Sequence, residues 1–459
     1  MHHTFHNSIT WRKRLNQNIS FWLICFTRSS APEGHLRLSL RSVPLASHQL
    51  NMKAQPVDMK LTDHTTTNIS STRTSIATGL ARSGFKWNRM HKSLIAVAAM
   101  TFAGAAFAQS SVTIFGVVDA RVAYGSGSVA KKTQLASSGM NASRLGFRGV
   151  EDLGDGMSAS FWLESAVNVD DGSFGTTNTN NQSSGSAGGG AMVFGRRSTV
   201  SLSGNWGELR LGRDFTPQFW NLSEFDPFGT TGNGTTQTLN SIITGTTQVR
   251  ASNSIGYFLP KETLNGFYGQ GMYYLGENNS NAVNVVCTSP RVPAGCGVST
   301  KNDGSGWGVR LGFKSGPFDV AAATSRTTNA AGSPRQSNIG GQWDAGVATI
   351  MAHYSRDKGV VNGSMRNAKG WLVGGLVPVG AGDIRISYSQ YAVNLAPAPD
   401  RITKKWALGY AYNLSKRTAL YVTYARLSNG GGATQALNGA TTAANGSSTG
   451  YDMGIRHRF

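Results

Sequence analysis

The chain ends in YDMGIRHRF, residues 451–459, and this segment alternates between two kinds of side chain. Every second position is apolar or aromatic, apart from one histidine: Tyr451, Met453, Ile455, His457 and Phe459. The positions between them hold aspartate, glycine and two arginines. Because successive side chains of a strand point to opposite faces of a sheet, a period of two predicts a β-strand with one apolar and one polar face.

The same period recurs upstream of the last strand, as in residues 112–121, 384–389 and 405–412. About sixteen such segments follow one another, joined by alternating short and long connections, with aromatic residues near their ends. Soluble all-β proteins also alternate, but these added features are typical of barrels whose apolar face meets lipid and whose other face meets water. The predicted fold class is all-β: a sixteen-stranded antiparallel transmembrane β-barrel, closed so that no backbone hydrogen bond is left unmade.

Composition agrees with a membrane barrel. Charged residues make up 14% and hydrophobic residues 39% of the chain, against about 25% and about 45–50% in ordinary soluble domains. No run reaches the roughly 20 apolar residues that a spanning helix needs. Half of the net charge of +20 lies in residues 1–108, and the remaining basic residues are scattered singly. We therefore expect no nucleic-acid partner, because proteins that bind nucleic acids cluster their lysine and arginine residues.

Residues 90–108 are predicted to be a secretory signal peptide. They run from a short basic start through an apolar stretch to an Ala-Phe-Ala cleavage site, which makes Gln109 the first mature residue. The alternative is a buried helix of the folded protein. Residues 1–89 show no sustained period, and two interpretations remain open: a start codon assigned too early, or a genuine leader that is also removed. The barrel is predicted to occupy residues 109–459.

Two of the three cysteines, Cys287 and Cys296, flank one short segment, whereas Cys25 lies in the leader. In an exported chain this spacing predicts a disulfide. Without a neighbouring histidine it is a poor metal site. We expect neither a metal nor another cofactor.

Several segments resemble the general porins of proteobacteria, especially the betaproteobacterial branch: SSVTIFGVVDARV (110–122), SRLGFRGVEDLGDGMSASFWLE (143–164), GELRLGRDFTP (207–217) and the closing GIRHRF. The resemblance covers nearly all of residues 109–459. It implies an outer-membrane homotrimer of water-filled channels for small hydrophilic solutes and ions, with the third external loop folded into each lumen. It also implies contacts with outer-membrane lipid, lipopolysaccharide, periplasmic chaperones and the barrel-assembly machinery. Phe459, with Tyr451 on the same face, resembles the C-terminal signal that this machinery reads.

The resemblance also suggests a pore constriction. Residues 215–249 lack alternation, and Glu224 and Asp226 fall at the matching loop tip. The family's arginine cluster falls on Arg144, Arg213 and Arg250. The alternatives are solvated loop acids, and arginines that lie near lipid headgroups at strand ends.

The position of a residue in the alternating pattern, here called its parity, indicates which face of the strand its side chain is on. Parity places most of these arginines inside the barrel. It supports Arg144 and Arg250 but disagrees for Arg213, which a β-bulge would have to turn inward. The same alternation places five further bases inside: Arg148, Arg197, Arg310, Arg385 and Lys405.

An arginine ring facing two carboxylates favours anions, and guanidinium groups stay charged near neutral pH.

The sequence gives little support to an enzyme, since residues 109–459 contain only two histidines, His353 and His457. A G-x-S-x-G match at residues 446–450 lies in a loop with no helix after it, as a nucleophile elbow would require. A second alternative is a substrate-specific channel or an adhesin-like surface barrel. Specific sugar channels need lumen aromatics, and most aromatics here take the outward phase.

Overall fold

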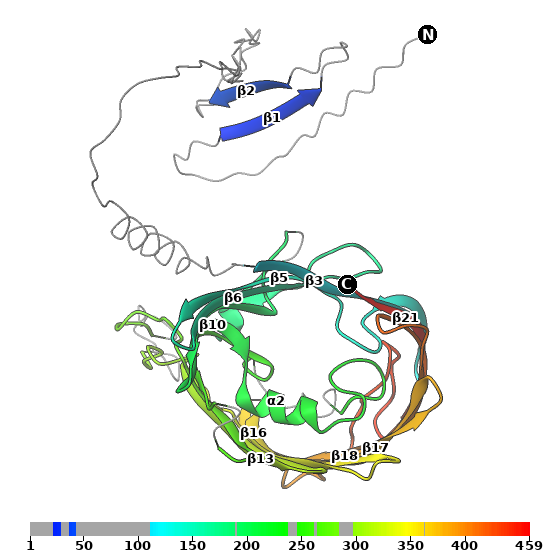
Figure 1. Ribbon diagram of the computed structural model, residues 1–459. Coiled ribbons are helices and arrows are strands. Elements are labelled where there is room, and N and C mark those ends of the chain that lie inside the picture. The colour runs from blue at the N-terminus through cyan, green and yellow to red at the C-terminus, as the bar shows by residue number, and fades with distance from the viewer. Residues whose placement is uncertain are drawn as a thin grey trace, which may run out of the picture. The chain divides into compact units, whose positions relative to one another are not determined.

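The alternating segments form strands that close into one antiparallel barrel (Figure 1). The computed structural model describes residues 111–188, 191–236, 246–260, 264–283, 297–361 and 363–459, and the backbone of two earlier segments. The barrel strands are β3 (Ser111–Gly127), β4 (Lys131–Ser137), β5 (Arg144–Gly154), β6 (Met157–Ala166), β9 (Arg197–Gly204), β10 (Gly207–Phe215), β11 (Arg250–Phe258), β12 (Phe267–Tyr274), β13 (Gly306–Ser315), β14 (Phe318–Thr327), β15 (Arg335–Asp344), β16 (Thr349–Val361), β17 (Ser364–Val379), β18 (Gly382–Val393), β19 (Arg401–Asn413), β20 (Thr418–Gly430) and β21 (Ser447–Arg458).

The barrel has sixteen strand positions, because β4 and β5 share one of them. Both pair with β3, β4 along its second half and β5 along its first half. Between them residues 138–143 leave the sheet. The buried Asp119 carboxylate accepts hydrogen bonds from the backbone N–H groups of Gly139, Met140 and Asn141 at 2.6–3.0 Å. One aspartate therefore satisfies the donors that the interruption removes from the ladder.

The two faces of the wall differ as the alternation predicts. On β13 the outward side chains Trp307, Val309 and Leu311 are exposed, whereas the inward Arg310 is buried. The last strand pairs with the first from Ser448 to Arg458, which closes the sheet. In the described residues no helix is both long enough and apolar enough to cross a bilayer.

The third long connection, residues 216–249, is named the constriction loop. Its described parts are residues 216–236 and 246–249. It opens with α2 (Pro217–Glu224), and the proline at the helix start fits a position whose N–H has no helical partner. Figure 1 shows α2 inside the ring of strands. The Asn221 side chain donates to the Ala321 carbonyl of β14 at 2.7 Å, and Gln218 bonds Gln336 of β15 at 2.8 Å. These bonds attach the helix to the inner wall.

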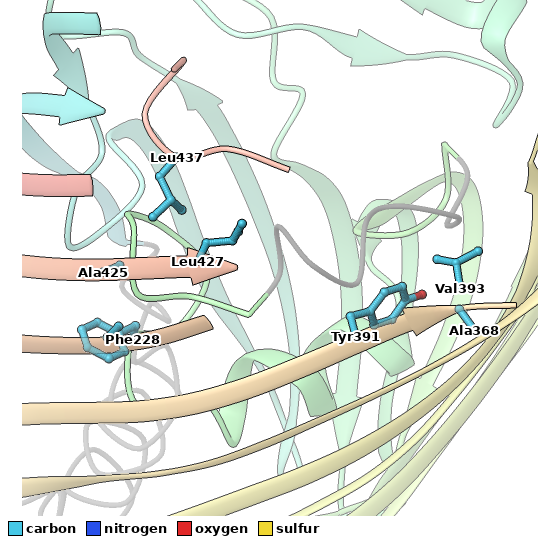
Figure 2. Close-up of a cluster of buried hydrophobic side chains, with 8 residues drawn as sticks. Phe228, Ala368, Tyr391, Val393, Ala425, Leu427 and Leu437 are labelled. Carbon is cyan, nitrogen blue, oxygen red and sulfur yellow. The ribbon is translucent and has the colours of Figure 1, made fainter. Parts of the chain in front are cut away.

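Apolar side chains cover part of the inner wall near the long-loop end of the barrel. Phe228 of the constriction loop and Leu437 of the last long loop belong to one buried cluster with Ala425 and Leu427 of β20 (Figure 2). Alternation predicted a small, polar or basic inner face. Loops cover this part of the wall and exclude water from it. Apolar side chains are therefore favoured there.

The long connection before β9 carries further short elements: β7 (Thr177–Asn178), the 3-10 turn η1 (Ser183–Gly185) and β8 (Ser186–Ala187). The chain divides into two compact units, Met1–Ile95 and Ala96–Phe459. In the first unit β1 (Trp22–Arg28) pairs with β2 (Leu36–Ser42) as an antiparallel hairpin. This hairpin lies within residues 1–89, for which the sequence showed no sustained period, and β2 alternates only over its seven residues, LRLSLRS. The predicted cleavage site and the pair Cys287 and Cys296 lie outside the described residues.

Candidate pore constriction

A cavity of about 640 Å³ lies between the constriction loop and the opposite wall of the barrel. On the wall side it is lined by Arg144 of β5, Arg197 of β9, Arg250 of β11 and Arg196 in the preceding connection. These four residues are named the basic wall. The loop side presents Phe219, Trp220 and Ser223 of α2 and residues 226–231 after it, and Arg385 of β18 also lines the cavity.

One carboxylate organises the basic wall. Glu164 of β6 is buried, and its Oε1 lies 2.5 Å from Arg196 Nε and 3.8 Å from Arg144 Nε. The indole N–H of Trp162 donates to the other oxygen at 3.1 Å. A buried carboxylate with these partners stays charged and holds both arginines in place.

Aromatic rings orient the remaining wall arginines. The Arg250 guanidinium lies 4.5 Å from the Phe215 ring centroid, and its Nε donates to the Arg196 carbonyl at 2.7 Å. Arg197 lies 4.6 Å from the Trp162 ring, with Asp214 at 3.9 Å. Stacking fixes a guanidinium without neutralising it, so its positive field persists in the cavity.

The lining of the cavity carries an excess of positive charge. Among the described residues, the lining holds five arginines and two carboxylates, Glu164 and Asp226. Arg385 has a further partner in Asp383, 2.6 Å away, and it donates to the Pro227 carbonyl at 3.3 Å. The field across this neck is therefore set mainly by the four arginines of the basic wall.

The two predicted loop acids lie differently from the expected facing pair. Asp226 borders the cavity, but its carboxylate accepts hydrogen bonds from the Phe228 N–H at 2.9 Å and from the Thr236 N–H and hydroxyl at 2.8 and 2.7 Å. Burial raises the pKa of the Asp226 carboxyl, and the hydrogen bonds of Thr236 and Phe228 act in the opposite direction. Glu224 is exposed at the end of α2 and does not line the cavity. Asp226 shapes the loop instead of presenting its charge.

Comparison with known proteins decides the family. Residues 94–432 match the Gram-negative porin family. The chain belongs to the Gram-negative porin family. Outer membrane porin protein 32 of Delftia acidovorans is 34% identical over 81% of this chain and all of its own length. An outer membrane porin protein of Bordetella pertussis is 28% identical over 81% of this chain and all of its own length.

Solved structures agree with this family. An anion-selective porin from Comamonas acidovorans superposes with a TM-score of 0.63 at 32% identity, over 76% of this chain and all of its own. In-vitro folded OmpT of Vibrio cholerae, at 13% identity and a TM-score of 0.53 over 76% of this chain and 98% of its own, shares the fold alone. The predicted betaproteobacterial porin resemblance and the sixteen-stranded barrel are confirmed. The chain is an outer-membrane general diffusion porin, a channel protein.

In this porin, Arg213 does not line the cavity. The pairing of β10 with β11 shifts between Gly212 and Asp214, so the chain has a β-bulge where the sequence required one. The Arg213 guanidinium donates to the Gly195 carbonyl at 2.7 Å and to the Ser252 hydroxyl at 2.8 Å. Arg148 faces inward on β5, stacked 5.4 Å from the Trp162 centroid, and it also stays outside the cavity lining.

Three other inward basic residues of the porin bind the constriction loop. They lie on the side of the barrel opposite the basic wall. Arg310 donates to the Asn221 side chain at 2.9 Å, and Lys405 donates to the Asn233 carbonyl at 2.9 Å. Arg385 holds Pro227, as described above. Parity predicted that all three point inward, and this is confirmed. Arg310 and Lys405 therefore hold the loop, and the four arginines of the basic wall face it across the cavity. Arg385 both bonds the loop and lines the cavity.

Sequence reasoning missed two residues of the porin's neck. Arg196 precedes β9 in the chain, so alternation could not place it, and only its neighbour Arg197 was assigned to the lumen. Glu164 lies two residues after Trp162 on β6, so both side chains point inward. This alternation could have predicted that Glu164 faces the lumen.

The two predicted assembly residues lie on the outer face of the porin, as alternation indicated. Phe459 exchanges backbone hydrogen bonds with Gly116 of β3 at 3.1 and 3.2 Å. Its ring covers Gly116, where a β-carbon would lie 2.3 Å from the ring edge. The ring of Tyr451 packs at a tilt against that of Tyr424, with ring centroids 4.9 Å apart. Phe459 thus completes the seam between the last strand and the first.

Proposed function

We propose that this porin prefers anions over cations among the small hydrophilic solutes and ions that it passes, and that it works as a homotrimer. The observation that carries the proposal is the imbalance of charge at the neck, where five arginines line the cavity with two carboxylates. Arginine rings favour anions in pores. The related Comamonas acidovorans protein, an anion-selective porin, is consistent with this preference.

The test is the reversal potential of the purified protein in a planar bilayer under a salt gradient. We expect its sign to correspond to anion permeation, and to stay unchanged between pH 6 and pH 8, since guanidinium groups do not titrate there. A cation-type reversal potential would refute the proposal.

We further propose that the mature porin begins at Gln109, after removal of residues 1–108. The motivation is the signal-peptide pattern of residues 90–108 and the start of β3 at Ser111. N-terminal sequencing of protein taken from outer membranes should begin within one or two residues of Gln109. A mature chain that retains residues 1–89 would contradict both interpretations of the leader.

We also propose that lipopolysaccharide binds a row of exposed bases on the outer face. These bases share the outward phase of neighbouring strands between β14 and β20: Arg326, Arg335, Arg356, Lys358, Lys369, Lys404 and Arg426. Arg335 stands opposite both Arg326 and Lys358 in the ladder, and Arg356 stands opposite Lys369. Like charges placed opposite each other destabilise a sheet. A bound polyanion would therefore reduce the repulsion among these basic side chains.

The surroundings of this row support an outer-leaflet lipid. Tyr354, Trp371 and Trp406 lie beside it on the side of the short turns, as an interfacial aromatic girdle would. Directly below Arg356 an apolar groove of about 430 Å³ runs over Leu311, Ala322 and Ile339 on the outer face. Phosphates at the bases and an acyl chain in the groove fit a phosphorylated glycolipid.

A triple variant tests the lipid proposal: Arg335→Gln, Arg356→Gln and Lys358→Gln. Added lipopolysaccharide should raise the unfolding temperature of the wild-type protein but raise that of the triple variant much less. Lys131→Gln, which removes an exposed outward base on β4, serves as the control and should keep the full rise. Equal shifts for the triple variant and the wild type would reject the site.

A further inference from the structure

The constriction loop follows the inner wall, and every second strand along its path presents a glycine to it. The order of the loop residues matches the order of the strands. Each loop residue stands against one wall glycine: Pro217 against Gly308 of β13, Phe225 against Gly340 of β15, Pro227 against Gly374 of β17, Phe228 against Gly409 of β19 and Asn233 against Gly450 of β21. We name these five glycines the glycine track.

The loop lies so close to the five glycines that a residue with a β-carbon at these positions would collide with it. A β-carbon on Gly340 would lie 2.5 Å from the Phe225 ring, and one on Gly409 would lie 2.9 Å from the Phe228 ring. On Gly308 the nearest atom would be Pro217 Cδ at 2.9 Å, and on Gly450 the Asn233 amide at 2.8 Å. Side-chain carbons do not approach within 3.0 Å, so a β-carbon at any of these positions would force a shift.

The loop, and not the wall, would move. Each track glycine sits in a strand that is hydrogen-bonded on both sides, as Gly340 is between Ala321 and His353. The loop is attached mainly by side-chain contacts, and its track residues Phe225 and Phe228 are buried against the wall. A ladder is stiffer than such contacts, so added volume on the wall displaces the loop toward the basic wall.

We propose that the glycine track sets the distance between the constriction loop and the wall, and thereby the width of the neck. This inference rests on the proposed function, because it assumes that solutes pass between the loop and the basic wall. The glycines act as positioning residues, which hold the loop away from Arg144 and Arg250 without touching the permeating ion. Larger residues on the track would narrow the pore.

Single-channel conductance in planar bilayers tests the track with Gly340→Ala and Gly409→Ala. Both variants should show a loss of conductance relative to wild type, and liposome swelling should show a smaller exclusion limit for sugars. The matched control is Gly271→Ala on β12, where a β-carbon would meet nothing within 4 Å. It should conduct as the wild type does. Wild-type conductance in both track variants would overturn the inference.

Two further variants guard against a general defect in folding. Gly409→Ala combined with Phe228→Leu removes the ring atom that the new β-carbon meets, so conductance should recover toward the wild-type value. Failure to recover would contradict the proposed contact. On Gly450→Ala the three atoms nearest to the new β-carbon belong to the Asn233 side chain, and this variant provides the measurement if Gly340→Ala does not assemble. A wild type that forms no channel would instead reject the proposed function.

Discussion

Replacing three arginines of the basic wall, as Arg144→Gln, Arg196→Gln and Arg250→Gln together, is expected to remove most of the anion preference. Two arginines would then remain in the cavity lining with two carboxylates, which leaves the neck close to neutral. Two unit charges 4 Å apart interact by about 1 kcal/mol in bulk water, which corresponds to about a fivefold change in the local concentration of an anion. We therefore expect the anion/cation permeability ratio to fall by about tenfold or more at low salt.

The matched control lies on the same strand and face as Arg144. Arg148→Gln removes one inward arginine of β5 that does not line the cavity, and it should change the ratio much less than Arg144→Gln. Glu164→Gln removes the carboxylate that pairs with Arg196 and Arg144, so it should shift selectivity further toward anions. All effects should shrink at 1 M salt, where the Debye length is about 3 Å.

Reversal potentials across a salt gradient provide the measurement for each variant. If the arginines only satisfied loop carbonyls or lipid headgroups, the triple variant would lose stability at an unchanged reversal potential. An unaltered permeability ratio in folded triple-variant protein would place the constriction elsewhere.

Deleting Phe459 is expected to lower the amount of folded barrel in the outer membrane severely, while the channels that do assemble conduct normally. The residue lies outside the cavity, and its two backbone hydrogen bonds to Gly116 contribute only about 1 kcal/mol each. The ladder between β21 and β3 runs from Ser448 to Arg458 without it. A large loss of yield would therefore reflect recognition during assembly and not a weakened seam.

Three further variants separate recognition from stability. Phe459→Tyr keeps an aromatic end and should assemble well, whereas Phe459→Ala should resemble the deletion. Met453→Ala changes another exposed apolar residue of β21 and should be tolerated. Heat-modifiability in gels measures folded barrel, and refolding of the deletion variant into detergent should proceed nearly as for wild type. Normal yields of the deletion variant in cells would show that Phe459 carries no signal.

The sequence alone determined the barrel, its approximate strand number and the face of most side chains. Alternation with period two is a local property of an extended chain, so it places Arg144, Arg310 and Lys405 inside without any knowledge of the fold. It failed where the chain leaves regular extension. The bulge after Gly212 reverses the phase for Arg213, and Arg196 precedes its strand.

Tertiary structure decided what each inward residue does. Parity gives the face of a side chain but not its partner across the lumen, which depends on how residues 216–249 cross the barrel. Only the folded loop shows that Arg310 binds it while Arg250 faces it, and that Asp226 bonds its own loop. The glycine track likewise has no local signal. Its five members lie far apart in sequence, and they share a purpose only because the loop passes each in turn.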